Sequence, residues 1–364
     1  MPDPQPSRLA ALGWTSALDA ALAALGVEGL EPARVTVAYG ATFRVATTRG
    51  DELADTSGRL KHDATERRDL PAVGDWVAIK PTTIARGRST IHAVLPRSSV
   101  FSRRAAGEGT LEQIVATNVD VMFLVTDLDM DFNVRRLERY LTMTWESGAR
   151  PVILLNKSDI GESADERAAE AAAVAPGVPI HLISARTGAG LEALDTYLVP
   201  GRTVAVLGSS GVGKSTLINR LLGEERLATN TVRESDQRGR HTTTHRELVA
   251  LPGGALLIDT PGMREIQLWS SDAGILEAFD DVSTLAAGCF FANCGHESEP
   301  RCAVKAAVAD GRLAADRLES FLKLRREQTV LAARQDVLAQ QTLKKRDKAG
   351  AKALRKHVQL KDRS

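Results

Sequence analysis

The sequence predicts a multidomain protein with a small N-terminal β-barrel, a central α/β domain and a C-terminal helical module that carries the cysteines. The chain has 364 residues, which is too long for one compact core. Short alternating apolar runs separated by turn residues fill residues 34–95, and such runs are typical of a β-barrel. From about residue 118, unbroken apolar strands alternate with helices, which predicts a parallel sheet covered on both faces.

The composition is that of an ordinary globular chain. Hydrophobic residues make up 43% and charged residues 26%, which argues against wholesale disorder. The longest apolar runs, such as Val121–Val125, are far shorter than the roughly 20 residues of a membrane span. Met1–Ser7 lacks the basic and apolar segments of a signal peptide. We therefore expect a cytoplasmic protein without a membrane partner.

The N-terminal third is expected to hold an extension of residues 1–30 and a barrel of residues 31–100. Residues 8–26 are rich in Ala and Leu and predict one short helix. Residues 59–69 are too polar for a core, so we expect them in a loop or at the barrel edge. The expected barrel strands are Arg34–Ala38, Thr42–Thr47, Trp76–Lys80 and Thr90–Val94.

The α/β domain is expected over residues 101–275. It is followed by a metal-binding helical module over 276–340, with a long helical region from about residue 303, and by a tail over 341–364. The expected strands of the α/β domain are Asp120–Val125, Pro151–Leu155, Pro179–Ile183, Thr203–Leu207, 246–251 and 255–258. The expected helices are Phe132–Ser147, 164–175, 190–198 and 214–222.

One segment fits the pattern G-x-x-x-x-G-K-[ST] of a phosphate-binding loop. It follows an apolar strand and opens a helix, which is the context in which this pattern is specific. Small residues let backbone N–H groups curl around phosphate oxygens, and the helix N-terminus favours their negative charge. We expect Lys214 to reach the terminal phosphates and the Ser215 hydroxyl to ligate Mg²⁺. The segment is Gly208, Ser209, Ser210, Gly211, Val212, Gly213, Lys214, Ser215 and Thr216.

A second motif selects the base. Asn156, Lys157 and Asp159 form an N-K-x-D sequence at the end of a predicted strand. An Asp carboxylate there can accept the ring N–H and the exocyclic amino hydrogens of guanine, whereas adenine would leave it unpaired at a high cost in affinity. Ser184 and Ala185, again at a strand end, fit the backbone that contacts the guanine oxygen. Together with the phosphate-binding loop, these residues predict a GTP site.

A third motif, Asp259-Thr260-Pro261-Gly262, ends another apolar strand. Asp259 is expected to hold Mg²⁺ through water, and the Gly262 N–H to sense the γ-phosphate. The preceding segment, Gly239–His245, is interpreted as a switch loop in which a threonine closes over Mg²⁺ only when the γ-phosphate is present. The candidates are Thr242, Thr243 and Thr244. Among these we predict Thr243 as the catalytic and magnesium-binding residue.

The residue after D-T-P-G predicts slow intrinsic turnover. Many GTPases place a glutamine there to orient the attacking water, whereas this chain has Met263. Methionine cannot orient water, so another residue or a partner must do so. His241, beside the threonines, is the candidate catalytic residue, and His245 is the second choice. An ordinary polar role for both histidines stays open.

The order of these motifs is unusual. Most GTPases run from the phosphate-binding loop through the switch threonine and D-x-x-G to N-K-x-D and S-A. Here Asn156–Asp159 and Ser184-Ala185 come first, which indicates a circular permutation. Permutation is tolerated because the termini of domains often lie close together at the surface. As a consequence, the segment after Asp259–Gly262 leads directly into the C-terminal module.

All three cysteines of the chain lie close together in that module. Cys289, Cys294, His296 and Cys302 supply three thiols and one imidazole, which is enough for a closed tetrahedral Zn²⁺ site. With no ligand position left open, we expect one structural zinc that holds together a loop-rich stretch. Buried thiols beside a surface histidine are the alternative.

The net charge of +1 conceals a basic tail. Residues 321–364 carry 13 Lys and Arg against 4 Asp and Glu, whereas the first 320 residues carry 34 against 42. This asymmetry indicates either an acidic partner, with nucleic acid first, or a tail that only aids solubility. Because aromatic residues make up only 4%, we expect phosphate contacts to outweigh base stacking in any RNA contact, with binding that weakens steeply as salt is added.

Taken together, the motifs resemble the RsgA/YjeQ family of circularly permuted ribosome-assembly GTPases. The resemblance implies an N-terminal OB-fold, a central GTPase domain and a C-terminal zinc module. It also implies binding of a monomer to the small (30S) ribosomal subunit and its rRNA late in maturation, with release after subunit-stimulated hydrolysis of GTP to GDP. The segments that carry it, besides the Cys/His window, are Pro96–Arg104, Gln113–Asp120, Asn156–Asp159, Gly208–Thr216, Gly239–Thr244 and Asp259–Gly262.

Two other functions stay open at this point. Met263 is also compatible with an RNA-binding assembly factor that senses GTP with little or no turnover of its own. A P-loop kinase or ATPase is disfavoured by Asp159, because adenine offers no donor pair for its carboxylate.

Overall fold

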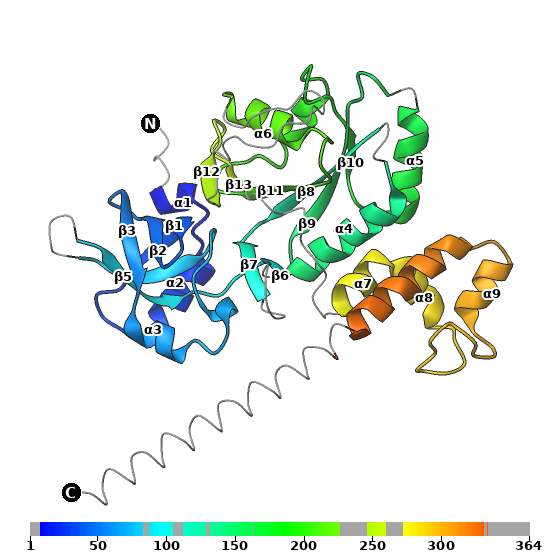
Figure 1. The fold of residues 1–364 in the computed structure, drawn as a ribbon, viewed down its shortest axis with the longest axis horizontal. Coiled ribbons are helices and arrows are strands. Elements are labelled where there is room, and N and C mark those ends of the chain that lie inside the picture. The colour runs from blue at the N-terminus through cyan, green and yellow to red at the C-terminus, as the bar shows by residue number, and fades with distance from the viewer. Residues whose placement is uncertain are drawn as a thin grey trace, which may run out of the picture.

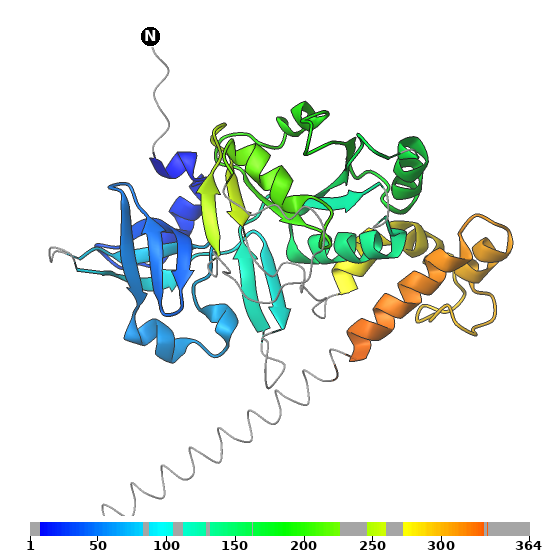
Figure 2. The ribbon, with the colours of Figure 1, turned by 45° about the horizontal axis from the view of Figure 1, so that its top comes forward.

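The computed structural model describes residues 8–82, 87–104, 112–128, 132–161, 163–225, 246–259, 272–330 and 333. A β-barrel, an α/β domain and a helical module follow one another along the chain (Figure 1). The barrel and the module lie at opposite ends of the α/β domain in both views (Figure 2). The predicted fold class is therefore confirmed.

Two helices precede the barrel, α1 (Arg8–Ala11) and α2 (Ser16–Ala23), where one helix over residues 8–26 was predicted. The chain turns between them at Gly13, whose φ is +88°. A Cβ there would lie 2.5 Å from the carbonyl oxygen of Gly201, so only glycine fits this close approach. The single-helix prediction was wrong because propensity alone does not show where the chain must pass another segment.

Five strands close into the barrel, in the order β1-β2-β3-β5-β4, with β4 returning to β1. Only the β3–β5 pair is parallel. Apolar side chains from alternate positions fill the interior, and Val35, Val45 and Ile79 are fully buried there. The four predicted strands are confirmed, and β3 was missed because its sequence is rich in acidic residues. The strands are β1 (Glu31–Tyr39), β2 (Thr42–Ala46), β3 (Asp51–Thr56), β4 (Trp76–Lys80) and β5 (Ser89–Val94).

The polar segment over residues 59–69 lies at the barrel edge, which is one of the two places predicted for it, and it is not a loop. It forms the helix α3 (Gly58–Asp63) and the 3₁₀ turn η1 (Arg67–Asp69) at the barrel edge. The Ser57 hydroxyl caps α3 by accepting a hydrogen bond from the backbone N–H of Leu60 at 3.1 Å. A capped helix of this length can present its polar side chains to solvent, so polarity did not exclude it.

A two-stranded hairpin, β6 (Val100–Arg104) with β7 (Glu112–Thr117), lies between the barrel and the α/β domain (Figure 1). No strand was predicted here from the sequence. Asn118 follows the hairpin with a φ of +53°, and its amide nitrogen donates to the carbonyl oxygen of Gly74 at 3.0 Å. This contact ties the hairpin to the barrel.

The sheet of the α/β domain has the order β10-β9-β8-β11-β13-β12. All its pairs are parallel except β12–β13, so the predicted parallel sheet is confirmed with one antiparallel edge strand. Its strands are β8 (Val121–Asp127), β9 (Arg150–Asn156), β10 (Ile180–Leu182), β11 (Thr203–Leu207), β12 (Glu247–Ala250) and β13 (Leu256–Asp259). Its helices are α4 (Val134–Ser147), α5 (Ala164–Val174) and α6 (Lys214–Leu222), with a 3₁₀ turn η2 (Leu191–Leu194) where a longer helix was predicted.

Both faces of this sheet are covered. Along β8, Met122 and Leu124 pack on one face in the cluster that includes α4, α5 and the C-terminal module. Val121 and Phe123 pack on the other face with residues of α6. This alternation explains why β8 appears in the sequence as an unbroken apolar run.

The barrel and the α/β sheet are joined edge to edge, because β1 pairs with β12 at Val37 and Glu247. Arg34 lies at this junction with only 2% of its surface exposed. Its guanidinium donates to Thr203 Oγ1 at 2.7 Å and lies 5.3 Å from the Trp76 ring centre. Burial lowers the pKa of Arg34 to about 10.

The C-terminal module packs against α4. It contains α7 (Asp272–Ala278), α8 (Asp280–Ala286), α9 (Ala303–Ala309) and a helix over 315–330. A continuous helical region from residue 303 was predicted, but the chain turns at Gly311, whose φ is +79°. Among the described residues, no helix is long and apolar enough to cross a membrane.

Candidate nucleotide and metal sites

The predicted nucleotide motifs gather at the carboxyl edge of the parallel sheet. Asn156 is the last residue of β9, the phosphate-binding loop begins directly after β11, and Asp259 is the last residue of β13. Ser184 follows β10 at the same edge. This edge is where open α/β sheets bind their ligands.

Asn156 joins three of these segments. Its side-chain amide donates to the carbonyl oxygen of Val212 in the phosphate-binding loop at 2.7 Å. Its amide oxygen accepts the backbone N–H of Ala185 at 2.9 Å. Because Asn156 is only 2% exposed, these hydrogen bonds are shielded from water. Segments far apart in the sequence therefore form one compact arrangement.

Two glycines of the loop are required by close contacts. A Cβ on Gly213 would lie 2.3 Å from the side-chain nitrogen of Asn156, and the φ of Gly213 is +95°. A Cβ on Gly208 would lie 2.3 Å from the carbonyl oxygen of Val125. Both positions thus need glycine to keep the loop against the strand ends.

Two charged side chains contact the loop, and of these Lys214 was predicted to act on phosphate. Lys214 Nζ donates to the carbonyl oxygen of Gly208 at 2.7 Å and to that of Ser209. The Ser209 hydroxyl in turn accepts from the Arg136 guanidinium of α4, and lies 3.5 Å from the Tyr140 hydroxyl. The α6 helix begins at Lys214, so its N-terminus faces the loop.

The predicted base-selecting carboxylate has two kinds of partner. Ser184 Oγ donates to Asp159 Oδ1 at 2.6 Å. The Arg186 guanidinium donates to Asp159 Oδ2 from Nε at 3.0 Å and also from Nη2. The Ser184 hydroxyl and the Arg186 guanidinium hold the pKa of the Asp159 carboxyl below its ordinary value. The carboxylate is therefore ionised.

Lys157 is oriented by an ion pair with Asp127, which was not predicted from the sequence. Its Nζ lies 2.7 Å from Asp127 Oδ2, and Asp127 is the last residue of β8. The backbone of Lys157 has a φ of +66°, in the left-handed region that non-glycine residues rarely adopt. The ion pair fixes the Lys157 side chain along the same sheet edge.

Several predicted residues lie outside the described residues: His241, Thr243, Gly262 and Met263. For Asp259, only the backbone is described. Their proposed roles in catalysis and magnesium binding remain predictions. Three residues at the site were missed, namely Asp127, Arg136 and Arg186. The sequence positions of Asp127 and Arg186 could have placed them at the site. Asp127 ends a strand, and Arg186 follows Ser184-Ala185 directly.

The predicted metal ligands come together in the C-terminal module. The ligand atoms of the four residues all lie within 4.8 Å of one another. Cys289 Sγ and Cys302 Sγ are 3.8 Å apart, and His296 Nδ1 is 3.6 and 3.4 Å from these sulfurs. A tetrahedral zinc with the usual bond lengths needs sulfur–sulfur separations of about 3.8 Å and sulfur–nitrogen separations of about 3.6 Å. The four side chains therefore fit one zinc ion.

The loop around this cluster is held by its own contacts. Cys302 caps the N-terminus of α9, because its sulfur accepts the backbone N–H of Lys305 at 3.4 Å. The Glu299 carboxylate accepts the backbone N–H of Gly295 at 2.7 Å. The backbone N–H groups of Glu299 itself and of Gly295 lower the pKa of Glu299 to about 2.

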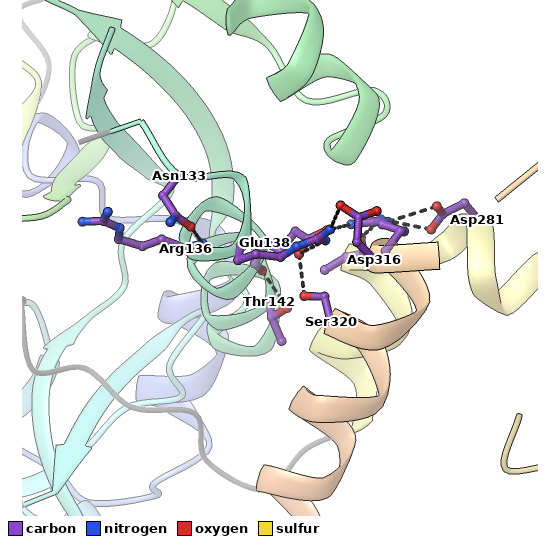
Figure 3. A network of polar contacts seen from close by, with 10 residues as sticks. Asn133, Arg136, Glu138, Thr142, Asp281, Asp316 and Ser320 are labelled. Carbon is purple, nitrogen blue, oxygen red and sulfur yellow. Dashed lines mark hydrogen bonds and ion pairs between the residues drawn. The ribbon is translucent and has the colours of Figure 1, made fainter. Parts of the chain in front are cut away.

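A buried ion-pair network fastens this module to α4 (Figure 3). Glu138 is fully buried and accepts hydrogen bonds from Arg317 at 2.8 Å, from Arg135 at 2.9 Å and from the Ser320 hydroxyl at 2.5 Å. Arg317 also pairs with Asp281 at 3.0 Å. Since α4 carries Arg136 as well, the same helix contacts both the phosphate-binding loop and the module.

Comparisons with known proteins identify relatives over most of the chain. The family described as RsgA GTPase matches residues 94–269, and the description 50S ribosome-binding GTPase matches residues 203–346. The small ribosomal subunit biogenesis GTPase RsgA of Opitutus terrae is 49% identical over 336 residues, which cover 90% of this chain and 92% of that protein. The RsgA of Streptomyces coelicolor is 40% identical over 342 residues, covering 93% and 92%.

Solved structures have the same fold. The crystal structure of YjeQ from Thermotoga maritima matches with a TM-score of 0.63 and 26% identity, over 82% of this chain and 99% of that one. YloQ, described as a circularly permuted GTPase, matches with a TM-score of 0.58 and 22% identity, over 83% and 96% of the two chains. The second match supports the permuted fold alone.

Proposed function

The chain belongs to the RsgA GTPase family and is therefore a GTP-hydrolysing enzyme, and we propose that it acts in late maturation of the small (30S) ribosomal subunit. In this proposal the GTP form binds the subunit and its rRNA, and subunit-stimulated hydrolysis releases the protein. One family description names the 50S subunit. We follow the relatives because they match about nine tenths of the chain, including the barrel and the metal cluster.

The arrangement around Asn156 carries the assignment of the GTP site. Its two hydrogen bonds hold the phosphate-binding loop and the Ser184-Ala185 turn in one unit. Asp159 follows Asn156 in the same N-K-x-D segment after β9. In this proposal its ionised carboxylate binds the donor edge of guanine. A nucleotide bound here would have its base at Asp159 and its phosphates at the N-terminus of α6.

Each motif residue has a role in this proposal. The backbone of the phosphate-binding loop cradles the phosphates, and Lys214 leaves its loop carbonyls to neutralise charge on the terminal phosphates. Ser215 and Thr243 would hold Mg²⁺, which supplies charge neutralisation at the β- and γ-phosphates. His241 would orient the attacking water in place of the usual glutamine, and Gly262 would sense the γ-phosphate.

Zinc is the metal that the C-terminal cluster favours. Three thiolates and one imidazole form a soft, closed ligand set with no position left for water. The ion would be structural, because it crosslinks a loop-rich segment that buries little core of its own. The module would then offer a fixed surface to rRNA, together with the barrel and the basic tail.

The protein is expected to be a cytoplasmic monomer. Its rRNA contacts should be dominated by phosphate, so subunit binding should weaken steeply between low and moderate salt. An affinity that stays flat over this range would contradict the rRNA part of the proposal.

Steady-state GTP hydrolysis, measured with and without purified small subunits, tests the proposal. We expect slow turnover alone and a marked increase when small subunits are added, with no comparable increase for large subunits. Equal stimulation by large subunits would contradict the choice of partner. No stimulation by either subunit would favour a factor that senses GTP without subunit-controlled turnover.

A further inference from the structure

Arg186 lies where a guanine base would have to bind, if the base is read by Asp159 as proposed. The inference below therefore rests on the proposed GTP site. The Asp159 carboxylate is largely buried, with 15% of its side chain exposed, whereas the Arg186 side chain is 73% exposed. Their ion pair therefore closes the outer side of the Asp159 carboxylate. No assigned role of the motif residues requires this contact.

The hydrogen-bonding capacity of Asp159 is nearly used up by its partners. Each carboxylate oxygen has about two lone pairs. Oδ2 accepts two donors from Arg186, namely Nε at 3.0 Å and Nη2, so this oxygen is full. Oδ1 accepts the Ser184 hydroxyl, and the backbone N–H of Asp159 itself also donates to this carboxylate.

Guanine presents two adjacent donors, the ring N–H and the exocyclic amino group, on either side of one carbon atom. The guanidinium group of arginine has the same N–C–N arrangement of donors. Binding of guanine needs one free position on each oxygen of Asp159. This requirement cannot be met until Arg186 releases Oδ2.

We propose that Arg186 is an internal stand-in for guanine that occupies Asp159 in the nucleotide-free protein and is displaced by the base. The backbone of Arg186 is held in place, since its carbonyl oxygen accepts a hydrogen bond from Arg220 Nη2 of α6 at 2.7 Å. The side chain can leave Asp159 while this backbone contact stays. Release requires only rotation of an exposed side chain. Arg186 thus lowers the apparent affinity for guanine nucleotides by reducing the fraction of protein with a free carboxylate.

The expected effect is modest because the pair is exposed on the arginine side. Exposed ion pairs favour the paired form by up to about fivefold, so Arg186→Met should tighten binding of both GTP and GDP by about threefold. The gain should be equal for the two nucleotides, because it arises at the base. Arg186→Lys, which retains the charge without the planar fork, should give a smaller gain.

Titration of the variants with fluorescent GTP and GDP tests this inference. Arg202→Met is the control, since Arg202 precedes β11 at the opposite edge of the sheet and its removal deletes the same charge. Loss of a positive charge alone should weaken binding of an anionic nucleotide, which is the reverse of the effect expected for Arg186→Met. In an Asp159→Asn background the gain from Arg186→Met should disappear, because its target carboxylate is gone.

The outcomes separate this inference from the proposed function. Failure of the wild-type protein to bind GTP would overturn the GTP site itself. If the wild type binds GTP, unchanged or weaker binding by Arg186→Met would overturn the role of Arg186 alone. A gain that persists in Asp159→Asn would do the same. In the expected case, added salt should reduce the difference between wild type and Arg186→Met, because salt screens the exposed pair.

Discussion

Replacement of Arg317 by methionine should loosen the C-terminal module from the α/β domain. The guanidinium of Arg317 contacts Glu138, Asp281 and the carbonyl oxygen of Ala278 at 2.8 to 3.1 Å, and its carbon lies 4.1 Å from the Phe279 ring centre. Removing one partner of a buried ion pair costs about 3 to 5 kcal/mol, because a buried charge loses its compensation. Glu138 keeps its bonds to Arg135 and Ser320, so the lower limit applies.

Hydrogen–deuterium exchange measures this loss locally. A change of about 3 kcal/mol corresponds to an increase of roughly 100-fold in the opening equilibrium. Amides of the helix over 315–330 should therefore exchange about 100-fold faster in Arg317→Met, while amides of the barrel should not change. Arg312→Met is the matched control, since Arg312 pairs with Asp310 on the surface of the same module.

Two results would refute this reasoning. Exchange of the helix over 315–330 that rises less than threefold would show that the Glu138 network does not hold the module. An equal rise in Arg312→Met would show that any lost arginine in the module has this effect. Should Arg317→Met fail to fold, Ser320→Ala removes only the 2.5 Å hydrogen bond to Glu138 and should give a smaller increase in exchange.

Three further predictions address the two sites. Asn156→Ala removes two buried hydrogen bonds and should weaken binding of GTP and GDP alike by about 30-fold, or about 2 kcal/mol, in a fluorescence titration. Weaker binding of GTP alone would contradict the role of Asn156 in holding the phosphate-binding loop and the Ser184-Ala185 turn together. The purified chain should contain one zinc by atomic absorption. Cys302→Ser should lose the metal and exchange its amides over 289–302 faster. Zinc retained by Cys302→Ser would exclude this ligand set. The folded-state pKa of Glu299 is lowered from 4.5 to about 2, so its contribution to stability is complete above pH 4.5 and is lost as the pH falls toward 2. Acid unfolding should therefore depend less on pH in Glu299→Gln, and identical profiles would contradict this contribution.

The sheet edge and the metal cluster were predictable because their signals are local in the sequence. The predicted bounds of β4, β11 and α6 coincide with the structure, since an apolar run or a glycine-rich turn fixes each one. The metal ligands lie within one short window, so spacing alone brought them together. The family resemblance drawn from these motifs is confirmed by the relatives.

The remaining features depend on contacts between distant segments, which periodicity does not record. The hairpin of β6 and β7 is held by pairing and by Asn118 and is not a continuous apolar run. The contact of Arg136 with Ser209 joins α4 to the phosphate-binding loop, which lie far apart in the chain. The domain bounds and the roles of the site residues stay predictions for experiment.

Competition of unlabelled GTP, GDP and ATP for bound fluorescent GTP tests most directly whether Asn156–Asp159 and the phosphate-binding loop form one guanine-selective pocket. The arrangement predicts displacement by GTP and GDP at similar concentrations, and no displacement by ATP at a roughly 1,000-fold higher concentration, because adenine offers no donor pair that could replace Arg186 at the Asp159 carboxylate. Displacement by ATP at the same concentration as GTP would contradict the assignment of the pocket.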